Sequence, residues 1–343
     1  MVFVGVDLHK HTITLAVVDG ARKRLARKRF SNLQSEAIVT FLKTLGPFQL
    51  VVEATASYEW FVQLVEPYAK RVVLAHPGKL RVIAESTRKS DNLDAQVLAE
   101  MLALDQIPES YRPTPRQREH RLLVRHRQFL QRKITGVRNK IRRLLSNHNL
   151  DREDLFTKAG QAALAEMSLP ASDRFCIDQL LAQWRGFRFQ LLHTDKQLRT
   201  FAESGTLEEC EDRRLLRTIP GIGVVTSDVV LAELAGWRRF TSLKQVSAYA
   251  GLVPGQRESA GKRRSLHIEK TGSPLLRWAM VQSAWQLVKR SERWLTIYSK
   301  LKGRIGSKKA IIAVSRRLLG VCLSVLKSQR DYCEQTLTQT ATA

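Results

Sequence analysis

Residues 2–7 read VFVGVD and residues 50–53 read LVVE. Each stretch is a short apolar run that ends in a carboxylate, at Asp7 and at Glu53. Short runs rich in valine are typical of strands buried in a sheet. If these two strands are neighbours, the two carboxylates lie side by side at the carboxyl edge of the sheet. These two stretches therefore indicate a sheet in the first hundred residues, with the two carboxylates at one edge of it.

Other strands and helices are predicted around this pair. Residues 12–18 and 24–30 have strand character and are separated by an Asp-Gly turn signal, so they can pair with the first strand as a meander. A helix is predicted before the LVVE strand and another after it, and residues 71–75 form a fifth strand. The order is three β elements, then α, β, α, β. It predicts a mixed sheet with helices packed on it, in the ribonuclease-H-like layout.

The composition points to nucleic acid as a partner. Lys and Arg number 57 against 32 for Asp and Glu, which gives a formal net charge of +25 over 343 residues. So large an excess needs an anionic partner. A membrane is not expected to be that partner, because no stretch approaches the roughly 20 apolar residues of a spanning helix and no secretory signal opens the chain. The four cysteines are scattered, which fits reduced thiols in a cytoplasm.

Residues 109–205 are predicted to form a basic helical arm. Two prolines at 113 and 115 mark a linker, and two helical stretches follow, at 116–149 and 178–201, which can pair as an antiparallel hairpin. Apolar residues recur near heptad spacing in the first of them, at Leu122, Phe129, Leu130, Ile134, Val137, Ile141 and Leu144. Its basic residues include Arg125, Arg132, Lys140 and Arg142. The arm is either a coiled coil with a solvated basic face or a dimerising element that lies against phosphates.

The third part, residues 206–343, is predicted to be helix-rich. Within it, Gly221 and Gly223 form a glycine-rich turn that opens a helix. Such a turn exposes backbone N–H groups that can bind phosphate without sequence preference, as in helix-hairpin-helix motifs. The alternative is a tight turn between core helices. The predicted domains are therefore 1–108, 109–205 and 206–343.

A second pair of carboxylates extends the first. Asp91 and Asp94 are three residues apart, which places both on one face of a helix. Packed across the sheet edge, that face would bring them to Asp7 and Glu53. Four such carboxylates repel one another unless cations lie between them, and their oxygens suit Mg²⁺ or Mn²⁺. Two ions could then act together in phosphoryl transfer.

Each acid also has an ordinary interpretation when taken singly. Asp7 can end a strand, Glu53 can be a surface acid, and Asp91 can cap the helix that Asp94 begins. Together, on a chain with few acids, they favour a metal site. The start of the chain also resembles the phosphate loop of actin-like ATPases and sugar kinases, but the second glycine-rich loop that those folds need is not found.

Several spaced motifs resemble the insertion sequence 110 family of transposases. The resemblance rests on Asp7, on Glu53 followed by Ala-Thr, and on KSDNLDA at residues 89–95, which contains Asp91 and Asp94. It continues with LRTIPGIG at 216–223, YAGLVP at 249–254 and SAGK at 259–262. The motifs span nearly the whole chain in order.

That resemblance implies a specific biochemistry. Family members resemble RuvC resolvases in the first domain and carry a nucleophilic serine in the second. They act as RNA-guided recombinases in bacteria and archaea, where a guide ("bridge") RNA from the element's non-coding end pairs with donor and target DNA. By its place in the motif, Ser259 matches the serine nucleophile. Many relatives read Ser-Gly where this chain reads Ser-Ala-Gly, so Ser265 is a second candidate. A cytoplasmic, nucleoid-associated protein is expected.

The surroundings of Ser259 fit phosphate chemistry. Arg257, Lys262, Arg263 and Arg264 can hold a scissile phosphate and offset its developing charge. A serine hydroxyl needs activation, which the acidic cluster can supply if the two domains meet, within a chain or across subunits. Paired cuts imply a dimer and, at synapsis, a tetramer. The alternatives are a hydrolytic junction resolvase that uses only the acidic cluster, and a non-catalytic nucleic-acid-binding protein.

Overall fold

A computed structural model describes residues 1–55, 57–83, 91–259, 262–268 and 272–334. Within these ranges, the side chains of residues 81–83, 91–94, 256–259 and 262–267 are outside the description. The chain divides into two compact units, Met1–Arg112 and Pro113–Ala343. No helix in the described ranges has the length and apolar character that crossing a membrane requires.

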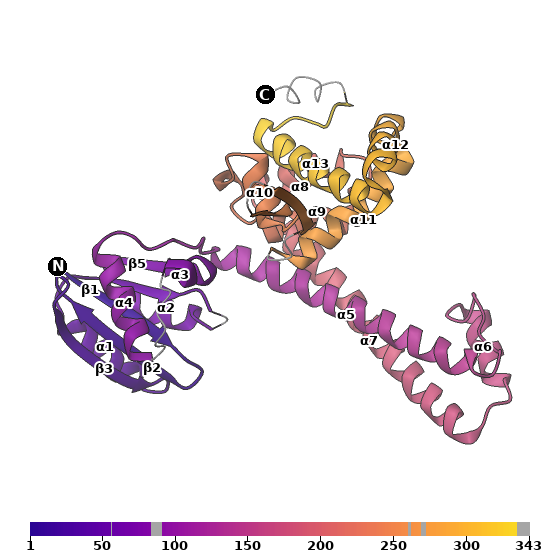
Figure 1. Cartoon of the computed structure of the whole chain (residues 1–343). Coiled ribbons are helices and arrows are strands. Elements are labelled where there is room, and N and C mark those ends of the chain that lie inside the picture. Colours follow the sequence, from indigo (N-terminus) through magenta and orange to yellow (C-terminus); the bar gives the residue numbers. More distant parts are fainter. Residues whose placement is uncertain (56, 84–90, 260–261, 269–271, 335–343) are drawn as a thin grey trace. The chain divides into compact units, whose positions relative to one another are not determined.

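The first unit is built on a five-stranded sheet with the strand order β3-β2-β1-β4-β5 (Figure 1). Strands β1, β2 and β3 form the antiparallel meander, while β4 and β5 run parallel to β1. The strands are β1 (Val2–Leu8), β2 (Thr12–Val18), β3 (Arg24–Ser31), β4 (Phe48–Glu53) and β5 (Arg71–Ala75). The helices are α1 (Ser35–Lys43), α2 (Glu59–Val65), α3 (Pro77–Ile83) and α4 (Asp91–Ala103). The mixed α/β prediction is confirmed.

Helices cover both faces of this sheet. Val4 and Val6 of β1 point to a core that also contains Ile38 of α1 and Phe61 of α2. The opposite face is covered by α4, because Val51 of β4 packs in a second cluster with Leu98, Met101 and Leu102. Alternate residues of β1 and β4 are therefore buried under different helices, as expected for strands covered on both sides.

The second unit begins with a long helical hairpin (Figure 1). Helix α5 (Pro115–Ser146) starts at a capping box formed by Thr114 and Gln117 and packs along α7 (Ala171–Glu203), with the short α6 (Lys158–Glu166) between them. The predicted pairing of two helical stretches is confirmed, although α5 ends three residues before the expected 149 and α7 begins seven residues before the expected 178. The predicted apolar seam is only partly right: Ile134, Val137 and Ile141 are buried, whereas Leu122 is 69% exposed. Phe129 is also exposed, because the seam with α7 lies on another side of α5 there.

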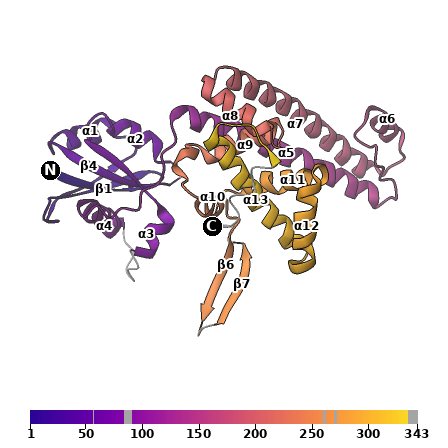
Figure 2. The ribbon, with the colours of Figure 1, turned by 90° about the horizontal axis from the view of Figure 1, so that it is seen from above.

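The rest of the second unit is a helical bundle. It contains α8 (Leu207–Arg217), α9 (Val224–Leu234), the 3-10 helix η1 (Trp237–Arg239), α10 (Leu243–Tyr249), α11 (Pro274–Arg290), α12 (Glu292–Ile305) and α13 (Ser307–Ser328). Helix α13 is largely buried in this bundle. A two-stranded antiparallel hairpin, β6 (Pro254–Ser259) and β7 (Lys262–Ile268), projects from the bundle (Figure 2). Ser259 is therefore the last residue of a strand, not part of an irregular loop.

Candidate active site

Asp7 and Glu53 lie near the carboxyl ends of two adjacent parallel strands, β1 and β4. The paired register of β1 and β4 reaches Val6 opposite Val52, so the next residues, Asp7 and Glu53, are side by side. The Asp7 side chain is 14% exposed. The predicted neighbourhood of these strands is confirmed, and it puts two acids at the carboxyl edge of the sheet.

Both acids belong to the face that α4 covers. Gly5 and Val51 are opposite each other in the register, and Val51 packs against α4. Because side chains alternate along a strand, Asp7 and Glu53 fall on that same face. The approach of the helix is close at Gly5, where an added Cβ would lie 1.9 Å from the Ala95 carbonyl oxygen. Only a glycine allows the helix backbone to lie so near the sheet.

Helix α4 begins at Asp91, so Asp91 and Asp94 are both in its first turn. Asp94 directly precedes Ala95, whose carbonyl rests on Gly5, and Asp7 is two residues beyond Gly5 on the covered face. The side chains of Asp91 and Asp94 lie outside the described residues. Within the described part of the chain, no group of three His, Cys, Asp or Glu side chains is close enough to hold a metal ion.

Two polar neighbours of this edge were missed by sequence reasoning. His9 lies where the chain leaves β1, and its Nε2 is 3.0 Å from Asp7 Oδ2. Thr55, two residues after Glu53, has a buried Oγ1 with no hydrogen-bond partner among the described residues. The spacing Asp-x-His after a predicted strand was a usable signal for His9, because the residue two beyond a strand's last acid still lies at the same edge. Thr55 belongs to the Glu-Ala-Thr motif, but the motif gave it no role at the site.

The backbone register separates the two serine candidates. Ser259 is the last residue of β6 and pairs with Lys262, next to the turn. Arg257 pairs with Arg264, and alternation assigns both to the same side of the ladder as Ser259. Ser265 pairs with Gln256, further from the turn and on the other side. Arg263 is opposite Glu258, also on that other side. Register therefore groups Ser259 with three basic residues; the side chains themselves are outside the description.

Comparison with known proteins supports the family resemblance through both units. Residues 4–149 match a transposase family model of the DEDD, IS110 type, and residues 213–299 match the model described as "Transposase IS116/IS110/IS902 family". A transposase for insertion sequence element IS1328 from Yersinia enterocolitica is 26% identical over 294 residues, covering 84% of each chain. A transposase for insertion sequence element IS1111A from Coxiella burnetii is 25% identical over 342 residues, covering 96% of this chain and 90% of the relative.

This chain belongs to the IS110 family of transposases. It is therefore a DNA transposase, and its DEDD domain implies DNA substrates and a requirement for divalent metal ions. A pilin gene-inverting protein from Moraxella bovis is also similar, at 23% identity over 352 residues, which covers 96% of this chain and 97% of the relative. Asp7, Glu53, Asp91 and Asp94 lie within the first matched segment of the transposase, and Ser259 lies within the second.

The arm of this transposase is fixed to the base of the β6–β7 hairpin by a buried acid. Glu233, which is 1% exposed, accepts two hydrogen bonds from Arg125 of α5, at 2.8 and 3.1 Å. It also accepts one from Ser273, the residue that caps α11 after the hairpin, at 2.9 Å. Burial alone would raise the pKa of Glu233, but Arg125 and Ser273 hold that pKa below its ordinary value. The charge of Arg125 is thus largely committed within the protein.

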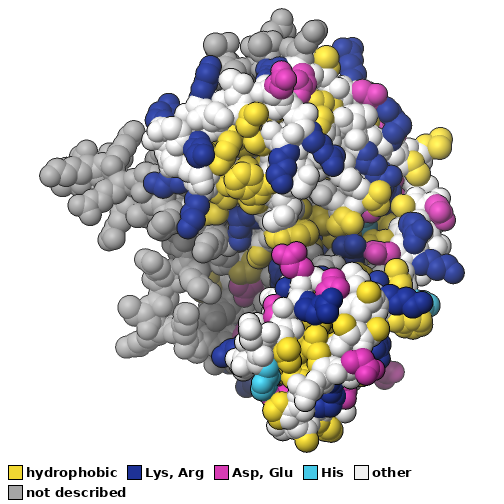
Figure 3. Space-filling view, turned by 90° about the vertical axis from the view of Figure 1, so that its right-hand side faces the viewer, with side chains coloured by type: hydrophobic (Ala, Val, Ile, Leu, Met, Phe, Trp, Pro, Cys, Tyr) yellow, Lys and Arg dark blue, Asp and Glu magenta, His cyan; other side chains and the backbone are white. Residues whose placement is uncertain are grey.

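The other basic residues predicted to contact nucleic acid from the arm differ in whether they have partners within the protein. Arg142 bonds to Asp151 at 3.4 Å and to the Glu153 carbonyl at 3.1 Å. Arg132 and Lys140 are exposed and have no acidic partner in the described ranges. Figure 3 shows such dark blue side chains spread over the face drawn, with hydrophobic side chains between them. Of the four predicted basic contacts in the arm, Arg132 and Lys140 are thus the ones without an acidic partner among the described residues.

The two glycines of the predicted phosphate turn have different roles. Gly221 has φ +87°, and an added Cβ would lie 2.8 Å from the Ser283 carbonyl of α11, so it packs as a tight core turn. Gly223 is the N-cap residue of α9, and an added Cβ there would meet nothing within 4 Å. The open backbone of Gly223 leaves the first N–H groups of α9 available to an anion.

Proposed function

We propose that this transposase cuts and rejoins donor and target DNA through Ser259, with Mg²⁺ or Mn²⁺ held by Asp7, Glu53, Asp91 and Asp94. The observation that carries the metal proposal is the placement of Asp7 and Glu53 on adjacent strands, on the face covered by the first turns of α4. The sheet order, with helices on both faces, supports our assignment of a ribonuclease-H-like fold to this unit.

The residues present fit a divalent cation. Carboxylate oxygens are the ligands that Mg²⁺ and Mn²⁺ prefer, and the buried Thr55 hydroxyl beside Glu53 supplies another oxygen without a partner among the described residues. When bound, such ions stabilise the attacking and leaving oxygens of a phosphoryl transfer. His9 can orient the Asp7 carboxylate through its 3.0 Å contact, as residues beyond the ligands commonly do.

The proposed reaction has two transesterifications. The Ser259 Oγ gives up its proton and attacks the scissile phosphorus, which forms a serine–phosphate bond and releases a DNA hydroxyl. A hydroxyl of the second DNA then attacks the same phosphorus, forms the new phosphodiester and returns the proton to Ser259. One phosphate ester bond is broken and one is formed in each step, so no ATP is needed. The basic residues Arg257, Lys262 and Arg264 offset the charge that develops on the phosphate.

A guide RNA and an oligomeric assembly complete the proposal. The net charge of +25 remains after every acidic residue is counted against a basic one, which supports binding of polyanions such as RNA and DNA. Leu122 and Phe129 of α5 and Phe189 and Leu192 of α7 are exposed apolar residues on the arm, and they support its role in joining subunits. Two subunits are required for paired cuts, and four at synapsis.

Metal-dependent cleavage tests the proposal directly. Glu53→Gln keeps the size of the side chain but removes a charged ligand, and we expect it to abolish cleavage of labelled donor DNA in the presence of Mg²⁺ and the flanking RNA. Glu36→Gln is the matched control, because Glu36 is an exposed acid in the first turn of α1. Equal cleavage by both variants would refute the acidic site. Omitting the RNA should abolish site-specific cleavage, and retained specificity would refute the guide.

A further inference from the structure

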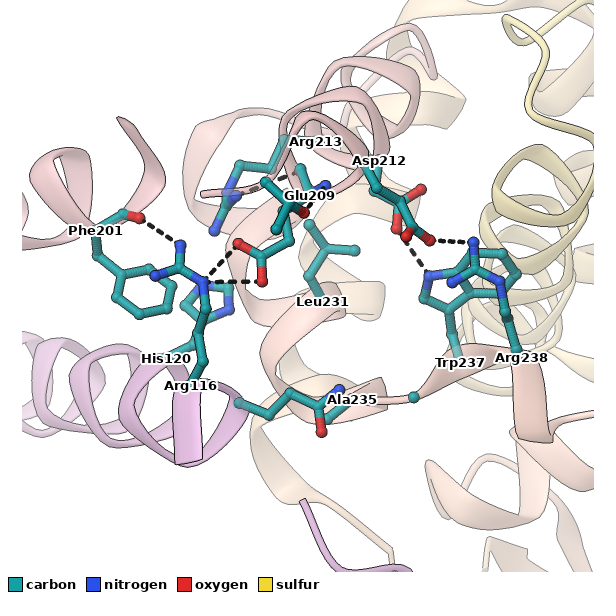
Figure 4. Close-up of a pocket in the computed structure, with 14 residues that line it drawn as sticks. Arg116, His120, Phe201, Glu209, Asp212, Arg213, Leu231, Ala235, Trp237 and Arg238 are labelled. Carbon is teal, nitrogen blue, oxygen red and sulfur yellow. Dashed lines mark hydrogen bonds and ion pairs between the residues drawn. The ribbon is translucent and has the colours of Figure 1, made fainter. Parts of the chain in front are cut away.

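Two of the cavities in the second unit are similar in size but differ in chemistry. The first, of about 250 Å³, lies among α5, α7, α8 and η1 (Figure 4). Its polar side chains satisfy one another. Arg116 bonds to Glu209 at 2.8 Å and to the Phe201 carbonyl at 2.9 Å, and the Trp237 Nε1 donates to Asp212 at 2.9 Å. These contacts join helices, so this cavity is explained by the fold.

The second cavity, of about 310 Å³, lies between α5, α7 and the start of α9. Its floor is apolar, because Val124, Leu198 and Val229 line it and belong to one buried cluster. Val224 lies at its rim and is exposed. This volume is at the lower end of the roughly 300–1,000 Å³ typical of small-molecule sites.

One buried polar side chain in this cavity lacks a partner. Gln128 of α5 is 9% exposed and lines the cavity. Its amide has no hydrogen bond to any other part of the chain that the structure describes. The amide atoms of Gln128 are not among the buried atoms that lack a partner, so they are open to the cavity and can bond a ligand there. A glutamine amide offers both donors and an acceptor.

The edge of the cavity carries unneutralised positive charge. Arg199 and Arg217 line it, and neither has an acidic partner among the described residues. The acids nearby are already paired, since Asp195 binds Arg127 at 2.6 Å. Asp228 is likewise held by Arg213 at 3.0 Å and by a histidine of α5. The cavity therefore attracts an anion.

Helix α9 adds anion-binding groups at the same edge. Its N-cap residue is Gly223, which has no side chain to occupy the first free N–H groups. Val224 and Val225, the first two residues of the helix, line the cavity. The start of helix α9, the two arginines, the apolar residues and the amide of Gln128 thus all line one cavity.

We infer that this cavity, named here the Gln128 pocket, binds one nucleotide of a single-stranded nucleic acid. The phosphate lies at the N-terminus of α9 with Arg217 and Arg199, the base enters the apolar slot, and Gln128 hydrogen-bonds to its edge. Only an unstacked base can enter such a slot, which excludes a continuous duplex. The inference deepens the proposed function, because it identifies where the transposase holds a strand that is not paired. RNA and DNA share the chemistry of this contact.

Binding without cleavage tests the pocket separately from the reaction. The full chain with Asp7→Ala is titrated, without divalent metal, into fluorescent oligouridylate, oligodeoxyuridylate and a duplex, and anisotropy is followed at several salt concentrations. Gln128→Leu and Arg217→Gln are compared with Gln183→Leu and Arg330→Gln, which change exposed residues of the same unit outside the pocket. Comparison of the oligouridylate with the oligodeoxyuridylate shows whether the pocket prefers RNA or DNA. Thermal unfolding is measured for every variant.

The two pocket variants have distinct expected signatures. Gln128→Leu should weaken single-strand binding by about fivefold or more without lowering the unfolding temperature, because the amide that it removes makes no hydrogen bond within the described part of the chain. Arg217→Gln should reduce the slope of log affinity against log salt by about 0.7, the value for one phosphate contact on a single strand. Duplex binding should change for neither. A photoactivatable 4-thiouridine strand should crosslink to peptides that contain Gln128 or Val224.

Two results would overturn the inference. Single-strand affinity equal to that of the control variants, with crosslinks elsewhere, would show that the pocket holds no nucleotide while leaving the proposed recombination intact. If the full chain binds no single-stranded nucleic acid, the inference that the pocket holds a nucleotide is also refuted. Failure of the recombination itself would show instead in the cleavage assays, with strand binding retained, so the two failures are distinguishable.

Discussion

Replacing Gly5 with alanine should separate α4 from the sheet. The added methyl would lie 1.9 Å from the Ala95 carbonyl oxygen and 2.5 Å from the Ala99 nitrogen, whereas ordinary contact begins at 3.4 Å. Both neighbours are backbone atoms, so no side-chain rotation relieves the overlap. The helix must move by about 1.5 Å, which is the difference between 1.9 and 3.4 Å.

That displacement affects both stability and activity. Overpacking of this kind costs about 1–3 kcal/mol, which is a large part of the roughly 5–15 kcal/mol that stabilises a domain. The first turn of α4 carries Asp91 and Asp94, so these residues move relative to Asp7. A misplacement of about 1 Å in a catalytic group can cost about 100-fold in rate. We therefore expect cleavage to fall by about that factor.

Hydrogen exchange and cleavage measure the two effects in one preparation. Amides of β1 and α4 in Gly5→Ala should exchange faster by the factor that corresponds to the lost stability, while DNA cleavage with Mg²⁺ falls about 100-fold. Gly20→Ala is the control, because an added Cβ at Gly20 meets nothing within 4 Å. Full cleavage by a destabilised Gly5→Ala chain would refute the positioning role of α4. Unchanged exchange would refute the close contact itself.

Three further perturbations concern the second unit. Arg213→Met should destabilise the protein by about 3–5 kcal/mol in denaturant unfolding, because it leaves the buried Asp228 carboxylate with only a histidine; a loss below 1 kcal/mol would contradict this. Burial alone would raise the pKa of Asp228, but its partners hold that pKa below the ordinary value of 3.8. The stability that Asp228 contributes is therefore present above pH 3.8 and is lost as the pH falls through the lower pKa of the folded state. Asp228→Asn should flatten this dependence in unfolding curves measured from pH 5 to pH 2. Burial raises the pKa of Cys322 to about 12. A thiol reagent at pH 8 should therefore label the exposed Cys176 in the native state and spare Cys322. Rapid labelling of Cys322 would show that α13 is not buried.

The sheet was predictable because its information is local. Valine-rich runs that end at Asp7 and Glu53 indicate two buried strands, each with an acid at its carboxyl end. The contact at Gly5 was not predictable, because a glycine in a strand does not reveal which backbone lies against it. The contact of His9 with Asp7 was predictable, because a residue two positions after Asp7, where the chain leaves the strand, still lies at the same edge of the sheet.

The second unit was harder to predict, for two physical reasons. The heptad pattern of α5 includes Leu122 and Phe129, but burial depends on which side α7 covers, and that is decided by the crossing of two helices rather than by either sequence. The β6–β7 hairpin has polar and basic residues on both strands and no apolar alternation. Its strands are therefore stabilised by cross-strand pairing that a periodicity search cannot detect.

The most direct measurement is a search for a covalent DNA–protein adduct. The full chain, its flanking RNA, Mg²⁺ and labelled donor and target DNA are mixed and quenched in denaturant, beside Ser259→Ala, Ser265→Ala and Asp7→Ala chains. Serine-linked recombination with metal ions at the acidic edge predicts an adduct in the wild type and in Ser265→Ala, and none in Ser259→Ala or Asp7→Ala. Cleaved DNA without an adduct, at the same rate in Ser259→Ala, would contradict it and leave a resolvase that uses water.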